Sequence, residues 1–341
     1  MAVKKLKIFV FAISLCMGGA VPIVAQKPVP TPKPKVDVWN PPAVPNPPKV
    51  SRETNQTTEK FITVDPNVNV KLCVSEGTLK INGWERNEVR VFVRSGRLAG
   101  FKVLEKDAAS GRPNWLLIAN MAPEGARPAP LSECLAGRSI EIDVPMKTSL
   151  NLTGRAAETV IDSVKKVSIK IIEGDISVRN ISEGISAATY QGDLIVENSG
   201  GSISAETTTG NILAYGVTPG QIGDLFKAKT GSGNVSIQQA EHRQIEASSI
   251  SGSVNFDGKF LSGGLYNFKT SNGSIRMQIP ARSSCTIKAS YGFGTFNSEI
   301  PLKYVYENVS PAGKNFQATV GSGDANINLT TNTGSILIKK Q

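Results

Sequence analysis

The segments Gly192-Asp-Leu-Ile-Val, Gly201-Ser-Ile-Ser-Ala and Gly210-Asn-Ile-Leu-Ala follow one another between residues 192 and 214 and share one pattern. Each begins with glycine, continues with Asp, Ser or Asn, and then places two apolar residues one position apart. Glycine permits the positive φ angle of a corner, and the polar side chain after it can bond to nearby backbone amides. Two apolar residues at this spacing point to the same face of a strand. The pattern therefore predicts a corner followed by a short strand with one apolar wall.

The same unit occurs nine times in the chain. It begins at Gly174, Gly192, Gly201, Gly210, Gly233, Gly252, Gly273, Gly323 and Gly334. The intervals between these glycines are 18, 9, 9, 23, 19, 21, 50 and 11 residues, so most lie near 9 or 20. One strand cannot bury its apolar wall alone, so successive units must stack, as they do in repeat proteins. The predicted fold is all-β: an irregular single-stranded β-solenoid, similar to a β-helix.

Short runs of alternating apolar and polar residues begin at Phe61, and no stretch of a dozen residues has strong helical spacing. We expect a domain over 61–341, with an N-terminal β-sheet portion over 61–150 and the repeat portion over 151–341. The interval of 50 residues after Gly273 indicates one coil enlarged by a hairpin.

Residues 1–25 are typical of a secretory signal peptide. Lys4, Lys5 and Lys7 precede an apolar run, and Ala25 is the small residue expected at the cleavage site. A retained membrane anchor is the alternative, although the run is short for a span and contains Gly18 and Pro22. We expect an exported protein, located in the periplasm, at the cell surface or in the medium, with no membrane span after cleavage.

Nine of the twenty prolines lie between Pro28 and Pro48, which favours an extended and disordered spacer over 26–60. Of the formal net charge of +10, +6 lies before residue 51. The remaining +4 is too dilute to predict nucleic-acid binding, which requires clustered Lys and Arg.

Three cysteines follow the signal segment. Cys73 and Cys134 flank the first β region, and we expect them to form a disulfide, since exported proteins can oxidise their thiols. Two buried free thiols are the alternative. Cys285, in a strand-like run, is interpreted as a small core residue.

Catalytic, cofactor and metal sites are not predicted. The single histidine, His242, lies in a polar connection and is interpreted as a solvated loop residue. Asp175, Asp193 and Asp324 occupy the second position of their units and could form an acidic row. Asn and Ser occupy the same position elsewhere, so turn bonding is the better interpretation. Without zinc spacings, a phosphate loop or a serine elbow, no cofactor is implied.

Two surface features leave binding open. Trp84 could stack on a carbohydrate, but a cap on the first core is favoured. The runs Glu206-Thr-Thr-Thr, Thr270-Ser-Asn and Thr330-Thr-Asn-Thr look like exposed strand positions that either keep the surface soluble or bind glycans and proteins.

The run Gly77-Thr-Leu-Lys-Ile-Asn-Gly-Trp-Glu-Arg-Asn-Glu-Val-Arg-Val, then Ile142-Asp-Val-Pro and the repeated units, resembles the bacterial putative-adhesin family. The similarity spans most of 61–340. It implies an exported, β-solenoid-like domain with no catalytic residues and no known ligand.

Together these features predict a non-enzymatic protein of the cell envelope that serves adhesion, scaffolding or binding of an envelope protein or glycan. A β-helical polysaccharide-degrading enzyme and an envelope-stress signalling partner are the alternatives.

Overall fold

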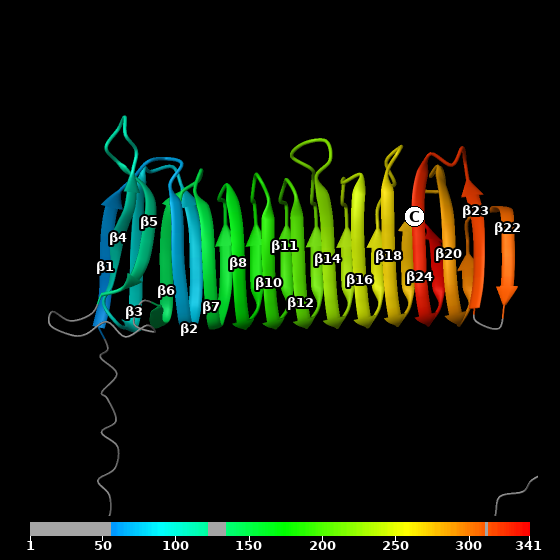
Figure 1. Cartoon of the computed structure of the whole chain (residues 1–341), viewed down its shortest axis with the longest axis horizontal. Coiled ribbons are helices and arrows are strands. Elements are labelled where there is room, and N and C mark those ends of the chain that lie inside the picture. Colours follow the sequence, from blue (N-terminus) through cyan, green and yellow to red (C-terminus); the bar gives the residue numbers. More distant parts are fainter. Residues whose placement is uncertain (1–55, 122–133, 311–312) are drawn as a thin grey trace, which may run out of the picture. The chain divides into compact units, whose positions relative to one another are not determined.

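The computed structural model describes residues 56–121, 134–310 and 313–341. These ranges contain 25 strands and no helix, and the strands belong to one sheet (Figure 1). The all-β prediction is therefore confirmed, and the described ranges offer no helix that could cross a membrane. The predicted signal segment with Ala25, and residues 26–55 of the predicted spacer, lie outside the described residues.

Six strands form the N-terminal part of the sheet. They are β1 (Gln56–Thr63), β2 (Asn69–Trp84), β3 (Glu88–Gly96), β4 (Ala99–Lys106), β5 (Pro113–Asn120) and β6 (Leu135–Pro145). β3 pairs antiparallel with both β1 and β6, and β4 and β5 form an antiparallel hairpin. β2 runs parallel to β5, β6 and β7 (Ser149–Asp162), so it joins this part to the strands that follow.

The first strand begins at Gln56, whereas the sequence predicted that the spacer continues to residue 60. β1 has few apolar side chains, and its backbone ladder with β3 holds it in place. Arg90 of β3, whose Nε donates a hydrogen bond to Glu59 Oε1 at 2.7 Å, adds a side-chain contact between the two strands. A strand fixed in this way lacks the apolar alternation by which the other strands were predicted.

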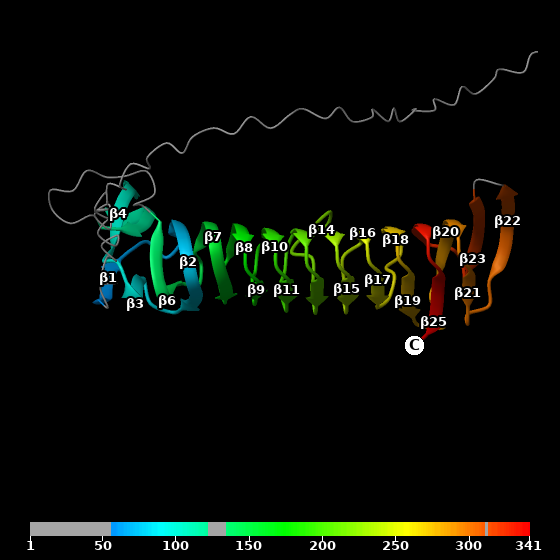
Figure 2. The same cartoon turned by 90° about the horizontal axis from the view of Figure 1, so that it is seen from below.

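From β8 onward the strands alternate between two parallel ladders. The long-strand ladder contains β8 (Lys166–Glu173), β10 (Ile185–Gln191), β12 (Ile203–Thr209), β14 (Leu225–Ser232), β16 (Gln244–Ser251) and β18 (Leu265–Asn272). The short-strand ladder contains β9 (Ile176–Arg179), β11 (Leu194–Glu197), β13 (Ile212–Tyr215), β15 (Val235–Gln238), β17 (Val254–Asp257) and β19 (Ile275–Ile279). Up to β17, each strand pairs in register with the strand two positions later, so the ladders form the two rows of Figure 2.

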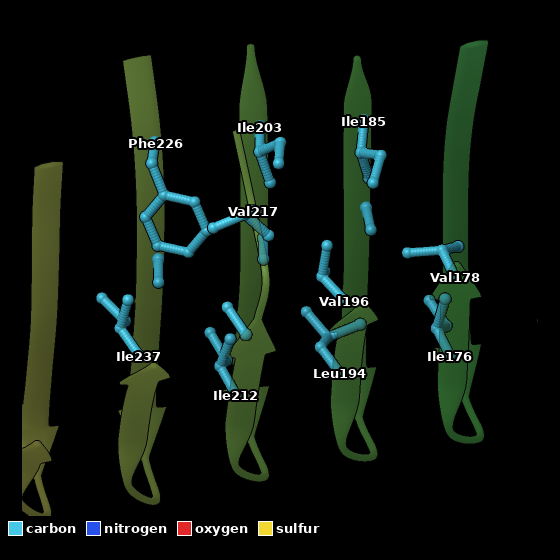
Figure 3. Close-up of a cluster of buried hydrophobic side chains, with 14 of the residues drawn as sticks. Ile176, Val178, Ile185, Leu194, Val196, Ile203, Ile212, Val217, Phe226 and Ile237 are labelled. Carbon is cyan, nitrogen blue, oxygen red and sulfur yellow. The ribbon is translucent and has the colours of Figure 1, made fainter. Parts of the chain in front are cut away.

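The core lies between the inward faces of the two ladders. In the long-strand ladder Ile185 pairs with Ile203, and Ile203 pairs with Phe226. In the short-strand ladder Leu194 pairs with Ile212. All five side chains are at most 3% exposed, and Figure 3 shows them stacked from strand to strand. Burying each such side chain contributes roughly 1.5–3 kcal/mol, so the repeated apolar pair is the main source of stability.

Seven of the nine predicted corner glycines form one column before the short strands. They are Gly174, Gly192, Gly210, Gly233, Gly252, Gly273 and Gly334. From Gly192 onward, a Cβ at each would lie 2.0–2.1 Å from the carbonyl oxygen of the preceding member. Glycine is thus required for the close approach of successive repeats. Gly294 extends the column, although the sequence analysis did not identify it.

Gly201 and Gly323 differ from the other predicted corners. They precede the long strands β12 and β24 (Ala325–Thr333), with φ of +84° and +82°. Each therefore lies at the opposite end of a repeat from the glycine column. This position explains the intervals of 9 and 11 residues, which are half-repeats rather than full ones.

The residue after each column glycine forms a hydrogen bond between its repeat and the next one. The backbone N–H of Asp193 donates to Asp175 Oδ1 at 2.8 Å, and that of Asn211 donates to Asp193 Oδ1 at 2.7 Å. The same bond continues through Asn234, Ser253, Ser274 and Ser335. The side chains accept bonds from backbone amides, as the sequence indicated, but those amides belong to the following repeat.

A row of buried hydroxyl groups lies beside the glycine column. It consists of Thr189, Thr207, Thr230, Ser249, Thr270 and Thr331, each at most 6% exposed. Each hydroxyl donates to the carbonyl oxygen of a column glycine; for example, Thr230 Oγ1 lies 2.8 Å from Gly210 O. The interpretation of the Thr-rich runs as exposed positions is therefore wrong for Thr207, Thr270 and Thr331. Their hydroxyls satisfy carbonyl groups that would otherwise be buried without a partner.

The C-terminal strands depart from chain order. They are β20 (Cys285–Phe293), β21 (Phe296–Ser298), β22 (Lys303–Ser310), β23 (Gly313–Val320), β24 and β25 (Ile336–Lys340). β24 lies between β18 and β20, and β25 lies between β19 and β21 (Figure 1). The long interval after Gly273 is thus a complete further repeat plus the β22–β23 hairpin, not one enlarged coil. The last repeat of the chain, β24 and β25, lies between this further repeat and the strands β18 and β19.

Candidate ligand-binding surfaces

A polar cleft of about 240 Å³ lies where the strand order departs from the chain order. We call it the terminal cleft; it is lined by residues of β18, β24, β20 and β23. Its polar lining side chains, besides Tyr291 and two hydroxyls of the buried row, are Lys269, Ser271, Ser290, Asn315, Thr330 and Asn332. Within the described part of the chain, none of these six side chains makes a hydrogen bond or ion pair. The terminal cleft therefore presents donors and acceptors that no group of the described residues occupies.

The row of buried hydroxyls ends at β20, which lines the cleft. Tyr291 takes the place that Thr331 has in the adjacent strand, and its ring packs near Phe296 and Phe316. Gly292, the next residue, has no side chain, and a Cβ there would lie 2.8 Å from Asn332 O. Glycine at this position therefore allows the close approach of β20 to β24 beside the cleft.

A second depression, of about 270 Å³, lies on the outer face of β15, β17, β19 and β25. We call it the charged depression, since Asp257, Arg276 and Lys339 contribute to its lining. These strands are neighbours in the lower row of Figure 2. Both surfaces were missed by sequence reasoning, because each includes a strand, β24 in the terminal cleft and β25 in the charged depression, whose neighbours in space do not follow the chain order.

The three aspartates of the repeat units do not form one acidic row. Asp175 and Asp193 are adjacent and joined through the backbone bond of Asp193, as described above. Asp324 lies at the other corner, where Ser322 Oγ donates to its Oδ1 at 2.9 Å. The interpretation as bonding residues accounts for all three. In the described ranges, no group of three or more His, Cys, Asp or Glu side chains is placed to hold a metal ion.

His242 is buried, so its interpretation as a solvated loop residue is wrong. Its side chain is 0% exposed, Nε2 lies 2.9 Å from Gly201 O, and the ring is near Phe226. Nδ1 has no hydrogen-bond partner among the described residues. Burial lowers the pKa of His242 below its usual value of 6.5, while the Gly201 carbonyl and Asp224 act in the opposite direction. The neutral ring, with Nε2 protonated, fits this environment.

We expect the protein to lose stability as the pH falls below about 6.5. The unfolded chain protonates His242 near pH 6.5, whereas the folded state resists the proton because its pKa is lowered. The unfolded state thus binds more protons in this window, and stability falls until the pH passes below the folded pKa. Thermal unfolding between pH 5 and 7 measures the slope. The His242→Gln variant, which does not titrate, should have a flat profile there, since the chain has no other histidine. An unchanged slope would contradict the assignment.

Trp84 closes the turn between β2 and β3. Its Nε1 donates to Glu88 O at 2.7 Å, and the Arg86 guanidinium lies 5.0 Å from the ring centroid. The side chain is half-buried rather than exposed. These contacts agree with a cap at the end of the first core and leave no open aromatic platform at this turn.

The cysteines divide into a pair and a single thiol. Cys73 on β2 and Cys134, just before β6, form a disulfide. Cys285 is free and 0% exposed, and burial raises the pKa of its thiol to about 12. Cys285 is therefore a core residue with an unreactive thiol.

No protein-family model matches the chain, and no curated protein matches it. Among solved structures, a putative cell adhesion protein from Clostridium sporogenes is 13% identical with a TM-score of 0.19, covering 84% of this chain and 100% of that one. A putative lipid binding protein from Parabacteroides distasonis is 13% identical with a TM-score of 0.41, covering 84% and 98%. A putative adhesin from Bacteroides fragilis is 12% identical with a TM-score of 0.34, covering 85% and 99%. At TM-scores below 0.5 these likenesses carry no argument.

Proposed function

We propose that this chain is an exported, non-enzymatic binding protein of the cell envelope, whose two parallel ladders form a β-solenoid. Residues 1–25 would direct export, and the proline-rich residues 26–55 would hold the folded part away from its attachment point. The Cys73–Cys134 disulfide is consistent with an oxidising compartment. The resemblance to the bacterial putative-adhesin family supports the same role and rests on the residues quoted for it.

The composition of the terminal cleft carries the proposal. Its lining has hydroxyls, two amides and one lysine, but no carboxylate and no histidine among the described residues. Hydrolysis or elimination of a polysaccharide requires paired carboxylates, or a carboxylate with a metal and a base. Hydroxyl and amide groups with free hydrogen-bonding capacity instead suit recognition of a polyhydroxylated ligand. We therefore assign glycan binding, without chemistry, to this cleft.

Binding to bacterial surface glycans tests this function. The full chain should bind at least one member of an array of surface polysaccharides and peptidoglycan sacculi. The Asn315→Ala/Asn332→Ala variant should bind it about 10-fold more weakly, since each lost hydrogen bond costs about 0.5–1.5 kcal/mol. Asn297→Ala, an exposed change on β21 outside the cleft lining, should bind normally. Absence of binding across the array would reject the proposal, and release of reducing ends or unsaturated sugars would identify an enzyme instead.

A further inference from the structure

The charged depression contains two cations without partners. Arg276 lies on β19 and Lys339 on β25, where Lys339 pairs with Gln278 and Arg276 pairs with Leu337. Both side chains are exposed on the outer face, and neither makes an ion pair or side-chain hydrogen bond with any described residue. By contrast, Lys227 pairs with Glu206 on the long-strand ladder at 2.6 Å. The depression thus holds two cationic groups, on neighbouring strands, that are available to an anion.

Uncharged and acidic groups lie beside these cations. Asn255 stands between Ser236 and Arg276 in the outward row, and Asp257 stands beside Gln278 in the next row. Gln341 Nε2 donates to Asp257 Oδ1 at 2.6 Å, which leaves the other carboxylate oxygen able to accept. Hydroxyl groups of a ligand would satisfy Asn255 and Asp257, whereas a polyanion without hydroxyl groups, such as polyphosphate, would leave both side chains without a partner and would be repelled by the Asp257 carboxylate.

The rows run across the strands, in the direction in which the repeats stack. Four strands about 4.8 Å apart span about 14 Å, which is roughly the length of three sugars in an extended chain. Each step between strands is close to the length of one pyranose unit. Side chains at equivalent positions of successive strands can therefore contact successive sugars. An acidic peptide offers carboxylates but few hydroxyls, and it lacks this repeat.

We infer that the charged depression binds an acidic polysaccharide, a glycan chain that carries carboxylates on its sugars. Arg276 and Lys339 bind the carboxylates, and Asn255 and Asp257 bind the hydroxyls. The inference names a ligand class and a second surface beyond the glycan-binding role proposed for the terminal cleft. It does not depend on that cleft.

Affinity electrophoresis of the full chain in gels containing polygalacturonate or alginate tests the inference. At least one of the two should retard the native protein, and the Arg276→Gln/Lys339→Gln variant should bind it at least 10-fold more weakly. The Lys288→Gln/Lys303→Gln variant removes the same charge from exposed positions on β20 and β22 and should bind normally. Methyl-esterified polygalacturonate, which has the same sugars without the charge, should not retard the native protein.

Four results would overturn the inference: no retardation by either polymer, equal binding of the methyl ester, an equal loss in the two lysine-containing variants, or equally tight binding of polyphosphate. The last two would indicate attraction by net charge alone. The terminal-cleft variant Asn315→Ala/Asn332→Ala should bind the acidic polymer normally. The two proposals can therefore fail separately. The proposed function is tested by the loss of glycan binding in Asn315→Ala/Asn332→Ala, and the inference by the loss of acidic-polymer binding in Arg276→Gln/Lys339→Gln.

Discussion

Replacing Gly233 with alanine is expected to lower the free energy of unfolding by about 2–5 kcal/mol, from left-handed strain and overpacking together. Gly233 has a φ of +146°, and a Cβ at this position would lie 2.1 Å from Gly210 O. The obstacle is backbone, which cannot rotate away as a flexible side chain can. Relief requires separation of β13 from β15, and the hydrogen bond from Gly233 N to Ser251 O would be strained on the other side.

Gly263→Ala is the matched control. Gly263 also has a positive φ, +69°, but a Cβ there would meet no atom within 4 Å. Its substitution should cost only the left-handed strain, about 1–2 kcal/mol. Urea unfolding followed by far-ultraviolet circular dichroism compares the two variants. Equal losses would show that close approach of the repeats does not require glycine at position 233.

The repeat itself could be predicted from local sequence. Glycine, a small polar residue and two alternating apolar residues each have a physical reason within the unit, and Gly192, Gly210 and Gly233 stand where that reason places them. The intervals of 9 residues were harder to interpret. Gly201 has the same local pattern but precedes a long strand, at the other end of the repeat. Sequence alone therefore does not distinguish the corner before a short strand from the corner before a long strand.

The order of the last repeats could not be predicted. β24 pairs with β18 and β20 through residues of the same kinds that join the other long strands, since any two such strands offer compatible parallel edges. Which strand occupies the place next to β18 depends on how the whole C-terminal segment packs. The terminal cleft arises from that packing, so its residues carry no distinctive local signal.

Buried polar groups were the other limit of sequence reasoning. In the Thr-Thr-Thr run after Glu206, only the residue that faces a glycine carbonyl is buried. That residue is Thr207, whose Oγ1 donates to Gly192 O at 3.0 Å. His242 was misplaced for a similar reason. Its neighbours Glu241 and Arg243 are polar, but its partner, Gly201 O, lies 41 residues away in the chain.

Removing the Cys73–Cys134 disulfide is expected to lower the free energy of unfolding by about 4 kcal/mol in the chain-entropy model. The two cysteines are 61 residues apart, so the bond closes a loop that contains β3, β4 and β5. Val74 and Leu135, the residues that follow the two cysteines, pair in the ladder between β2 and β6. The bond therefore lowers the conformational entropy of the unfolded chain by holding together the segments that form β2 and β6.

The Cys73→Ser/Cys134→Ser variant should unfold at lower urea concentration than the native protein, and reductant should not change it further. The native protein in reductant should approach the same midpoint. Cys285→Ala is the control, because its free thiol forms no bond and the variant should stay sensitive to reductant. If reductant leaves the native midpoint unchanged, the bond does not stabilise the folded state. The loss should appear first in β1–β6, since the repeats from β8 onward are joined by their own ladders, and hydrogen exchange resolved by residue would locate it there.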